Sequence, residues 1–148
     1  MATRIGKRKT AHAREIISRS GVVTGWVLDV HAWTTDENAD LRERKDSLNL
    51  SVRGTFTEEI SGVTKFDFLI YPVAQPDAGR AEIPCVGTFF RSKPVLDAVI
   101  TLSDLHFQTL VSVAVAGKLS ALEVTFQKLR YGTGLISSLL LSTSKTIE

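Results

Sequence analysis

The chain has 148 residues, of which 18 are Lys or Arg and 16 are Asp or Glu, so its formal net charge is +2. This length suits a single domain, and Leu, Ile, Val and Phe make up 46 residues, about 31% against less than about 20% in disordered chains. One cysteine excludes an internal disulfide, no apolar run is long enough to cross a membrane, and the first residues show no signal-peptide pattern. We therefore expect a folded cytoplasmic protein without a membrane span.

The positive charge is concentrated at the start of the chain. Residues 1–20 hold six basic residues and one acidic residue, a net charge of +5, whereas residues 21–148 hold 12 basic and 15 acidic residues, or −3. Because residues 1–20 have few large apolar side chains, burial cannot offset the entropy lost on ordering them. We expect them to form a basic, weakly ordered arm, with at most a short helix from Thr10 to Arg19. Residues 21–148 should form one domain.

From Gly21 onward, apolar residues alternate with period two, which is typical of half-buried strands. The segment 22–33 places Trp26 on the apolar face, which we assign to the core, and Trp33 on the opposite face. Residues 34–46 are mostly charged and predict a solvated loop. Two further strands near 48–56 and 66–70 predict a hairpin with its turn at residues 58–62. The predicted core includes Phe66, Phe68, Val124 and Phe126.

The second half of the chain supplies short strands and the only helical signal. Residues 73–83 predict a second long loop, followed by short strands at 85–91 and 95–102. A helix near 103–116 is indicated by apolar residues at helical spacing, by Ser103 as N-cap and by Gly117 as C-terminal glycine. The alternating β-branched residues of this segment also fit a strand, which is the alternative. A second hairpin should join residues 122–127 to 135–143 through a glycine-containing turn at 131–134.

This order of elements predicts a mainly β fold with about seven strands and one short helix. We expect an antiparallel two-sheet β-sandwich, because the strands do not alternate with helices as they do in a doubly wound α/β fold. A partly closed barrel is the alternative, since hydrophobic periodicity does not distinguish the two architectures.

The sequence indicates no catalytic residue, metal site or cofactor. Asp29-x-His31 could supply metal ligands from one strand face, but the matching residues Asp104 and His106 would diverge on a helix. Cys85 lies in an apolar run without a neighbouring base, so we expect a small buried side chain. Neither a serine-nucleophile elbow nor a phosphate-binding glycine loop is present.

Two features remain as candidate contact sites. Trp33 is expected to be partly exposed and suits a protein contact. The basic arm suits contact with nucleic acid or another polyanion. We expect a non-catalytic interaction or accessory module that binds another protein or itself. The first alternative is a nucleic-acid-associated protein, such as a jelly-roll shell subunit, and the second is a small enzyme with a spatially assembled site. The predicted anion contacts in the arm are Arg4, Lys7, Arg8, Lys9, Arg14 and Arg19.

Overall fold

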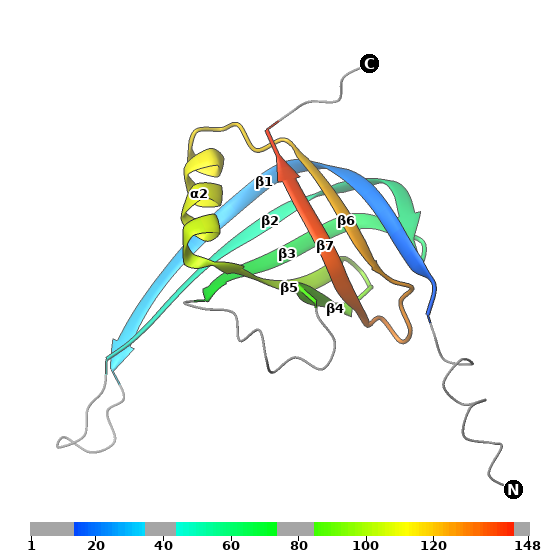
Figure 1. The fold of residues 1–148 in the computed structure, drawn as a ribbon, viewed down its shortest axis with the longest axis horizontal. Coiled ribbons are helices and arrows are strands. Elements are labelled where there is room, and N and C mark those ends of the chain that lie inside the picture. The colour runs from blue at the N-terminus through cyan, green and yellow to red at the C-terminus, as the bar shows by residue number, and fades with distance from the viewer. Residues whose placement is uncertain (1–13, 35–43, 74–84, 144–148) are drawn as a thin grey trace, which may run out of the picture.

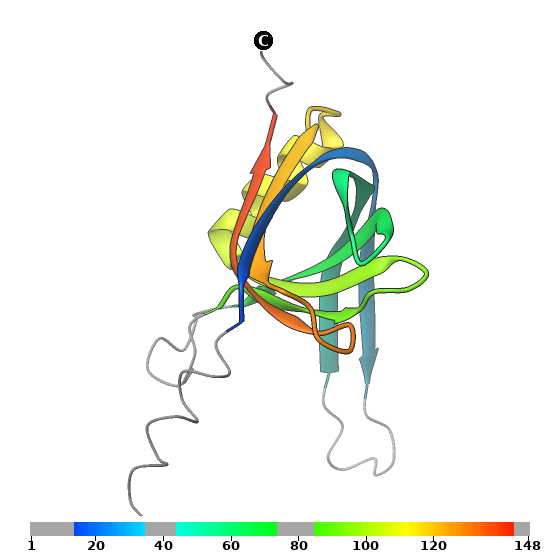
Figure 2. The same ribbon diagram turned by 90° about the vertical axis from the view of Figure 1, so that its right-hand side faces the viewer.

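The computed structural model describes residues 14–34, 44–73 and 85–143 (Figure 1). Within these residues seven strands close into a barrel in the order β1-β2-β3-β5-β4-β7-β6. Figure 2 shows that α2 lies against one side of this barrel, and that β1 and β2 extend away from it. In chain order the elements are β1 (Ile16–Thr34), β2 (Arg44–Ile60), β3 (Val63–Val73), β4 (Gly87–Arg91), β5 (Leu96–Ser103), α2 (Asp104–Val115), β6 (Ala121–Gln127) and β7 (Gly134–Ser142).

The predicted fold class is confirmed as mainly β with one short helix, and the barrel alternative is the architecture that forms. The two-sheet sandwich is wrong because β1 pairs with β2 on one side and with β6 on the other, so the hydrogen-bonded ladder runs around the whole barrel. The expectation of purely antiparallel pairing is also wrong. β5 inserts between β3 and β4 and runs parallel to β3, in register from Phe66 opposite Leu96 to Val73 opposite Ser103. No helix among the described residues is long and apolar enough to cross a membrane.

The first strand begins inside the segment that the sequence analysis assigned to the arm. Residues 16–20 belong to β1, and they pair with β6 from Ile16 opposite Gln127 onward. A helix over these residues is therefore wrong, and the boundary predicted at residue 20 lies within a strand. The reason is tertiary: Ile17 packs against the barrel core, which compensates for the low apolar content of its sequence neighbours. Residues 1–13 lie outside the described part of the chain.

The predicted helix and both predicted hairpins are confirmed. The Ser103 side chain caps α2 by accepting a hydrogen bond of 3.3 Å from the backbone N–H of His106, and Gly117 takes a φ of 74° just after the helix. Ser61 and Gly62 join β2 to β3 with positive φ at both positions, as a tight two-residue hairpin turn requires. Tyr131 and Gly132 make a second turn of this kind between β6 and β7.

Phenylalanine rings fill the inside of the barrel. Phe66, Phe68, Phe89 and Phe126 are all at most 2% exposed, and ring centroids of successive members lie 4.9, 5.6 and 5.0 Å apart. These rings come from β3, β4 and β6, so they connect opposite walls of the barrel. Gly54 on β2 makes room for them, since a Cβ there would lie 2.6 Å from the Phe66 ring. The buried positions predicted for Phe66, Phe68, Val124 and Phe126 are confirmed.

Replacing Phe68 by Ala should lower the free energy of unfolding by about 3–5 kcal/mol, because the change opens a cavity among rings that cannot collapse into it. The matched control is Phe90→Ala, since the Phe90 side chain is 45% exposed; its loss should stay below about 1 kcal/mol. Urea denaturation of both variants measures the difference. Equal losses for the two variants would contradict this account of the core.

Candidate interaction surfaces

β1 and β2 continue past the barrel wall as a two-stranded ribbon, defined here as residues 29–34 with their partners 44–49 (Figure 1). β2 pairs with β3 only from Leu50 onward. On its other side β1 pairs with β6 only as far as Val22, and the last backbone bond there runs from Val23 N–H to Ser120 O at 3.0 Å. In the described part of the chain, residues 24–34 of β1 therefore have no strand on that side. We call these residues the free edge.

A β-bulge decides which side chains of β1 face inward. The pairing with β2 slips between Val23 and Gly25, so one extra residue is inserted and the alternation of faces reverses. Val22 consequently lies on the outer surface, 52% exposed, whereas Trp26 lies on the same face as its buried partner Val52. The uninterrupted period-two face predicted over residues 22–33 is therefore wrong.

The side chains of Trp26 and Trp33 are exposed to a similar degree, although the sequence predicted a buried Trp26 and a partly exposed Trp33. Trp26 is on the inner face, but it is 38% exposed because it lies where the ribbon leaves the barrel, so its assignment to the core is wrong. Trp33 is 40% exposed, as expected, and its ring stacks on His31 with centroids 4.5 Å apart. An exposed aromatic ring that is already held by a neighbour loses little entropy on binding.

The inner face of the ribbon carries the apolar residues Val30, Ala32 and Leu48 together with Asp46. Val30 is 73% exposed, although its partner on β2, Leu48, packs partly against the barrel core. A groove of about 560 Å³ lies between the ribbon and the end of β3. Leu48 both lines this groove and packs against the core, so the groove is continuous with the apolar interior of the barrel. Its lining consists of Val30, Ala32, Asp46, Ser47, Leu48, Tyr71 and Pro72.

A second surface, positively charged, lies where β1 begins. Arg14, Lys128 and Arg130 line a hollow of about 330 Å³ together with Glu15 and Leu129. Arg14 is held there because its Nη1 donates to the carbonyl oxygen of Thr133 at 3.0 Å. The β6–β7 turn rests on the β4–β5 turn, which adds two more cations to the same end of the barrel. We call this group the basic end; its members are Arg14, Arg91, Lys93, Lys128 and Arg130.

The structure separates the basic residues predicted to contact anions. Arg14 belongs to the basic end, whereas the side chain of Arg19 donates to the carbonyl oxygens of Glu59 and Ser18 on the barrel surface. The other four, Arg4, Lys7, Arg8 and Lys9, lie outside the described residues. Sequence reasoning missed Lys128 and Arg130, because they join Arg14 only through the pairing of β1 with β6.

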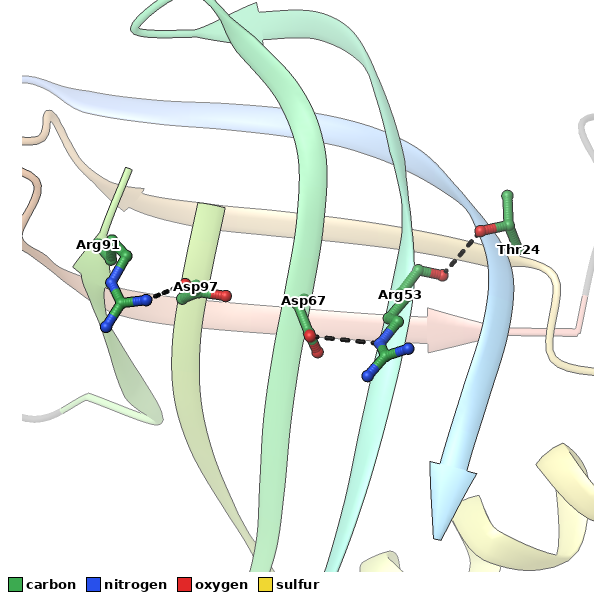
Figure 3. A network of polar contacts seen from close by, with 5 residues as sticks. All are labelled: Thr24, Arg53, Asp67, Arg91 and Asp97. Atoms are coloured by element: carbon green, nitrogen blue, oxygen red, sulfur yellow. Dashed lines mark hydrogen bonds and ion pairs between the residues drawn. The ribbon is translucent and has the colours of Figure 1, made fainter. Parts of the chain in front are cut away.

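Four charged side chains form a row across the outside of the barrel (Figure 3). Arg53 opposes Asp67, Asp67 opposes Asp97, and Asp97 opposes Arg91 in successive strand pairs. The two outer contacts are ion pairs, with N–O distances of 3.3 Å for Arg53–Asp67 and 3.6 Å for Arg91–Asp97. Burial raises the pKa of the Asp97 carboxyl above its ordinary value; Arg91 opposes this shift and the Asp67 carboxylate adds to it. The two ion pairs favour the register of β2 with β3 and of β4 with β5, whereas the facing Asp67 and Asp97 carboxylates add no stability to the β3–β5 pair.

The potential metal ligands of the sequence do not gather at one place in the described part of the chain. No three His, Cys, Asp or Glu side chains there lie close enough together to hold a metal ion. Cys85 is exposed, so the expectation of a buried thiol is wrong. Asp29 and His31 share the outer face of the ribbon, and Asp104 and His106 lie on the first turn of α2.

Comparison with known proteins gives no family for this chain. No family model matches it, and no curated protein or solved structure is similar enough to count as a match. Its function is therefore inferred from the geometry and charge of the described residues.

The stability of the fold should depend on the ionisation of Asp97. Because its pKa is raised in the folded chain, the folded state favours the protonated carboxyl more than the unfolded state does. The stabilisation from this proton is complete below the unfolded pKa and is lost as the pH rises through the folded pKa. The pH window of interest therefore lies between the unfolded and the folded pKa of Asp97. As the pH rises through this window, the free energy of unfolding of the wild type minus that of Asp97→Asn should fall.

Denaturation at several pH values measures this difference. Arg91→Gln serves as the control, since loss of the guanidinium should move the window to higher pH. Parallel stability curves for the wild type and Asp97→Asn would contradict the assignment.

Proposed function

We propose that this protein is a non-catalytic interaction module that binds another protein chain through the ribbon and its free edge. The observation that carries the proposal is that residues 24–34, within the described structure, present an unpaired strand edge. Such an edge offers a row of backbone N–H and C=O groups to an incoming strand. Backbone pairing gives affinity, and the alternating side chains on each face give specificity.

The composition of the free edge also supports binding. Proteins usually protect an exposed edge with lysine, proline or a very short strand. Residues 24–34 contain neither lysine nor proline, and the edge is 11 residues long. Val30 and Trp33 leave 73% and 40% of their surface exposed on its two faces. A strand added here would cover both side chains while it completes the hydrogen-bonded ladder.

A photo-crosslinking residue at position 30 tests the proposal in the cell that makes the protein. It should form adducts with a protein chain, whereas the same residue at Leu105 on α2, which is 72% exposed, should not. After mass spectrometry identifies the adduct, the purified partner should slow amide hydrogen exchange selectively in residues 24–34. Equal crosslinking at positions 30 and 105, or no protein adduct at position 30, would contradict the proposal.

Binding of a nucleic acid or another polyanion is a second candidate, favoured by the basic end. Arg14, Lys128 and Arg130 surround one hollow, and the chain immediately before Arg14 holds Arg4, Lys7, Arg8 and Lys9. A phosphate backbone lying across this end would meet the cations of the hollow and would release its own counterions, and the charge of residues 1–13 adds to the attraction. Among the described residues, Glu15 is the only acidic one that lines the hollow, so the local charge stays positive.

Changing Arg4, Lys7, Arg8 and Lys9 to Gln in the full chain should weaken binding to a random DNA duplex. The slope of log affinity against log salt should become less steep by about 0.9 for each phosphate that the variant no longer neutralises. Changing Arg14, Lys128 and Arg130 to Gln should have the same kind of effect, whereas Lys118→Gln, which follows the C-terminus of α2, should have none. Fluorescence anisotropy at low salt measures all of these. Absence of binding by the wild-type chain would eliminate this candidate.

A further inference from the structure

We propose that the chain that occupies the free edge is a second copy of this protein, paired antiparallel about a twofold axis through Val30. This inference rests on the proposed function, because it assumes that the free edge binds a strand. It goes further by naming the partner and the register. Twofold dimers are the commonest protein assemblies, and their interface must be complementary to itself. The side-chain pattern of residues 26–34 has this property.

The geometry of an antiparallel pair limits the possible registers. Directly opposite residues place their side chains on the same face of the sheet, so in a twofold pair one residue must lie opposite its own copy. If Asp29 lay on the axis, two carboxylates would face each other, and like charges directly opposite destabilise a pair. If His31 lay on the axis, each Asp29 would face a Trp33. Only with Val30 on the axis does Asp29 of each copy face His31 of the other.

The same register also matches the apolar residues. It extends from Trp26 opposite Thr34 to Thr34 opposite Trp26, and it places Leu28 opposite Ala32 on the inner face. On the outer face, Val27 faces Trp33, and both side chains are 40% exposed in the single chain. Val30, at 73% exposure, would pack against its own copy. The pairing therefore covers the most exposed apolar side chains of the free edge.

Asp29 and His31 are available for this contact. Across the ribbon Asp29 faces Asn49 and His31 faces Ser47, so β2 places no charge directly opposite either of them. Lys45, the nearest basic residue on this face of β2, lies opposite Trp33. Within the described residues Asp29 forms no ion pair. In the dimer, Asp29 of each copy lies opposite His31 of the other copy. One such pair stands on each side of the two central Val30 residues.

The mass of the purified full-length protein in solution, measured by light scattering and sedimentation over a concentration series, tests the proposal. The wild type should reach twice the single-chain mass of 16.2 kDa. His31→Asp places a second carboxylate opposite Asp29 at both ends of the pair. It should raise the dimer dissociation constant at least about tenfold, because like charges across an interface are strongly disfavoured. The double variant D29H/H31D restores the carboxylate–imidazole pairing in reverse order and should dimerise like the wild type.

Two further sets of variants test whether the dimer uses this register. A mixture of D29K with H31D should form the mixed dimer, although each variant alone should dimerise more weakly than the wild type. In that mixed dimer the introduced lysine faces the introduced aspartate, and the remaining His31 faces the remaining Asp29. Val30→Lys should abolish the dimer, whereas Leu105→Lys, at a similarly exposed position on α2, should not. Far-UV circular dichroism of each variant verifies that the barrel is folded.

The proposal is overturned if the folded wild type remains monomeric at every concentration, or if D29H/H31D and H31D lose the dimer equally. These results are distinguishable from failure of the proposed function. A monomeric protein that still crosslinks a different protein at position 30 keeps the free edge as a binding site and rejects the second copy as its occupant. Failure of both experiments rejects the free edge altogether.

Discussion

The arrangement of this protein depends on the unequal lengths of the strands that close its barrel. β1 has 19 residues, but its neighbour β6 has only seven. Every strand needs a partner on each side for its backbone groups to be satisfied without water. The first part of β1 has both partners and becomes part of the barrel wall. The rest has β2 alone within the described residues, and this is why the ribbon stands out from the barrel with one edge open.

The bulge near Gly25 allows one strand to serve both roles. Before the bulge, Gly21 and Val23 lie on the face of β1 that contacts the phenylalanine core. After the bulge, Trp26 lies on this inner face. An extra residue also increases local twist and bends the strand, which helps β1 turn away from the barrel. The basic end lies near the start of the same strand. β1 therefore links both candidate interaction surfaces, and its pairing places each of them.

Local signals in the sequence were sufficient for the helix, the hairpins and the buried faces of β3 and β6. Ser103 and Gly117 mark the two ends of α2 by their own chemistry, and the alternation around Phe68 is not interrupted. The one local sign of the bulge is the isolated Gly25, but glycine also occurs in regular strands, so it does not by itself show that the faces reverse there. The sequence could not choose the barrel over the sandwich, since both bury alternate residues. The free edge and the approach of Lys128 to Arg14 depend on long-range pairing, which local periodicity does not encode.

The pairing of the first strand with β6 also has a consequence for biosynthesis. Ile16 pairs with Gln127, which is 111 positions later in the chain, and such distant contacts slow folding because a long loop must close first. While the ribosome is still making α2, β1 can pair with β2, but β6 has not yet been made. The edge of β1 that later pairs with β6 therefore stays exposed in the nascent chain. Until the barrel closes, this edge is open to wrong pairing with strands of other chains.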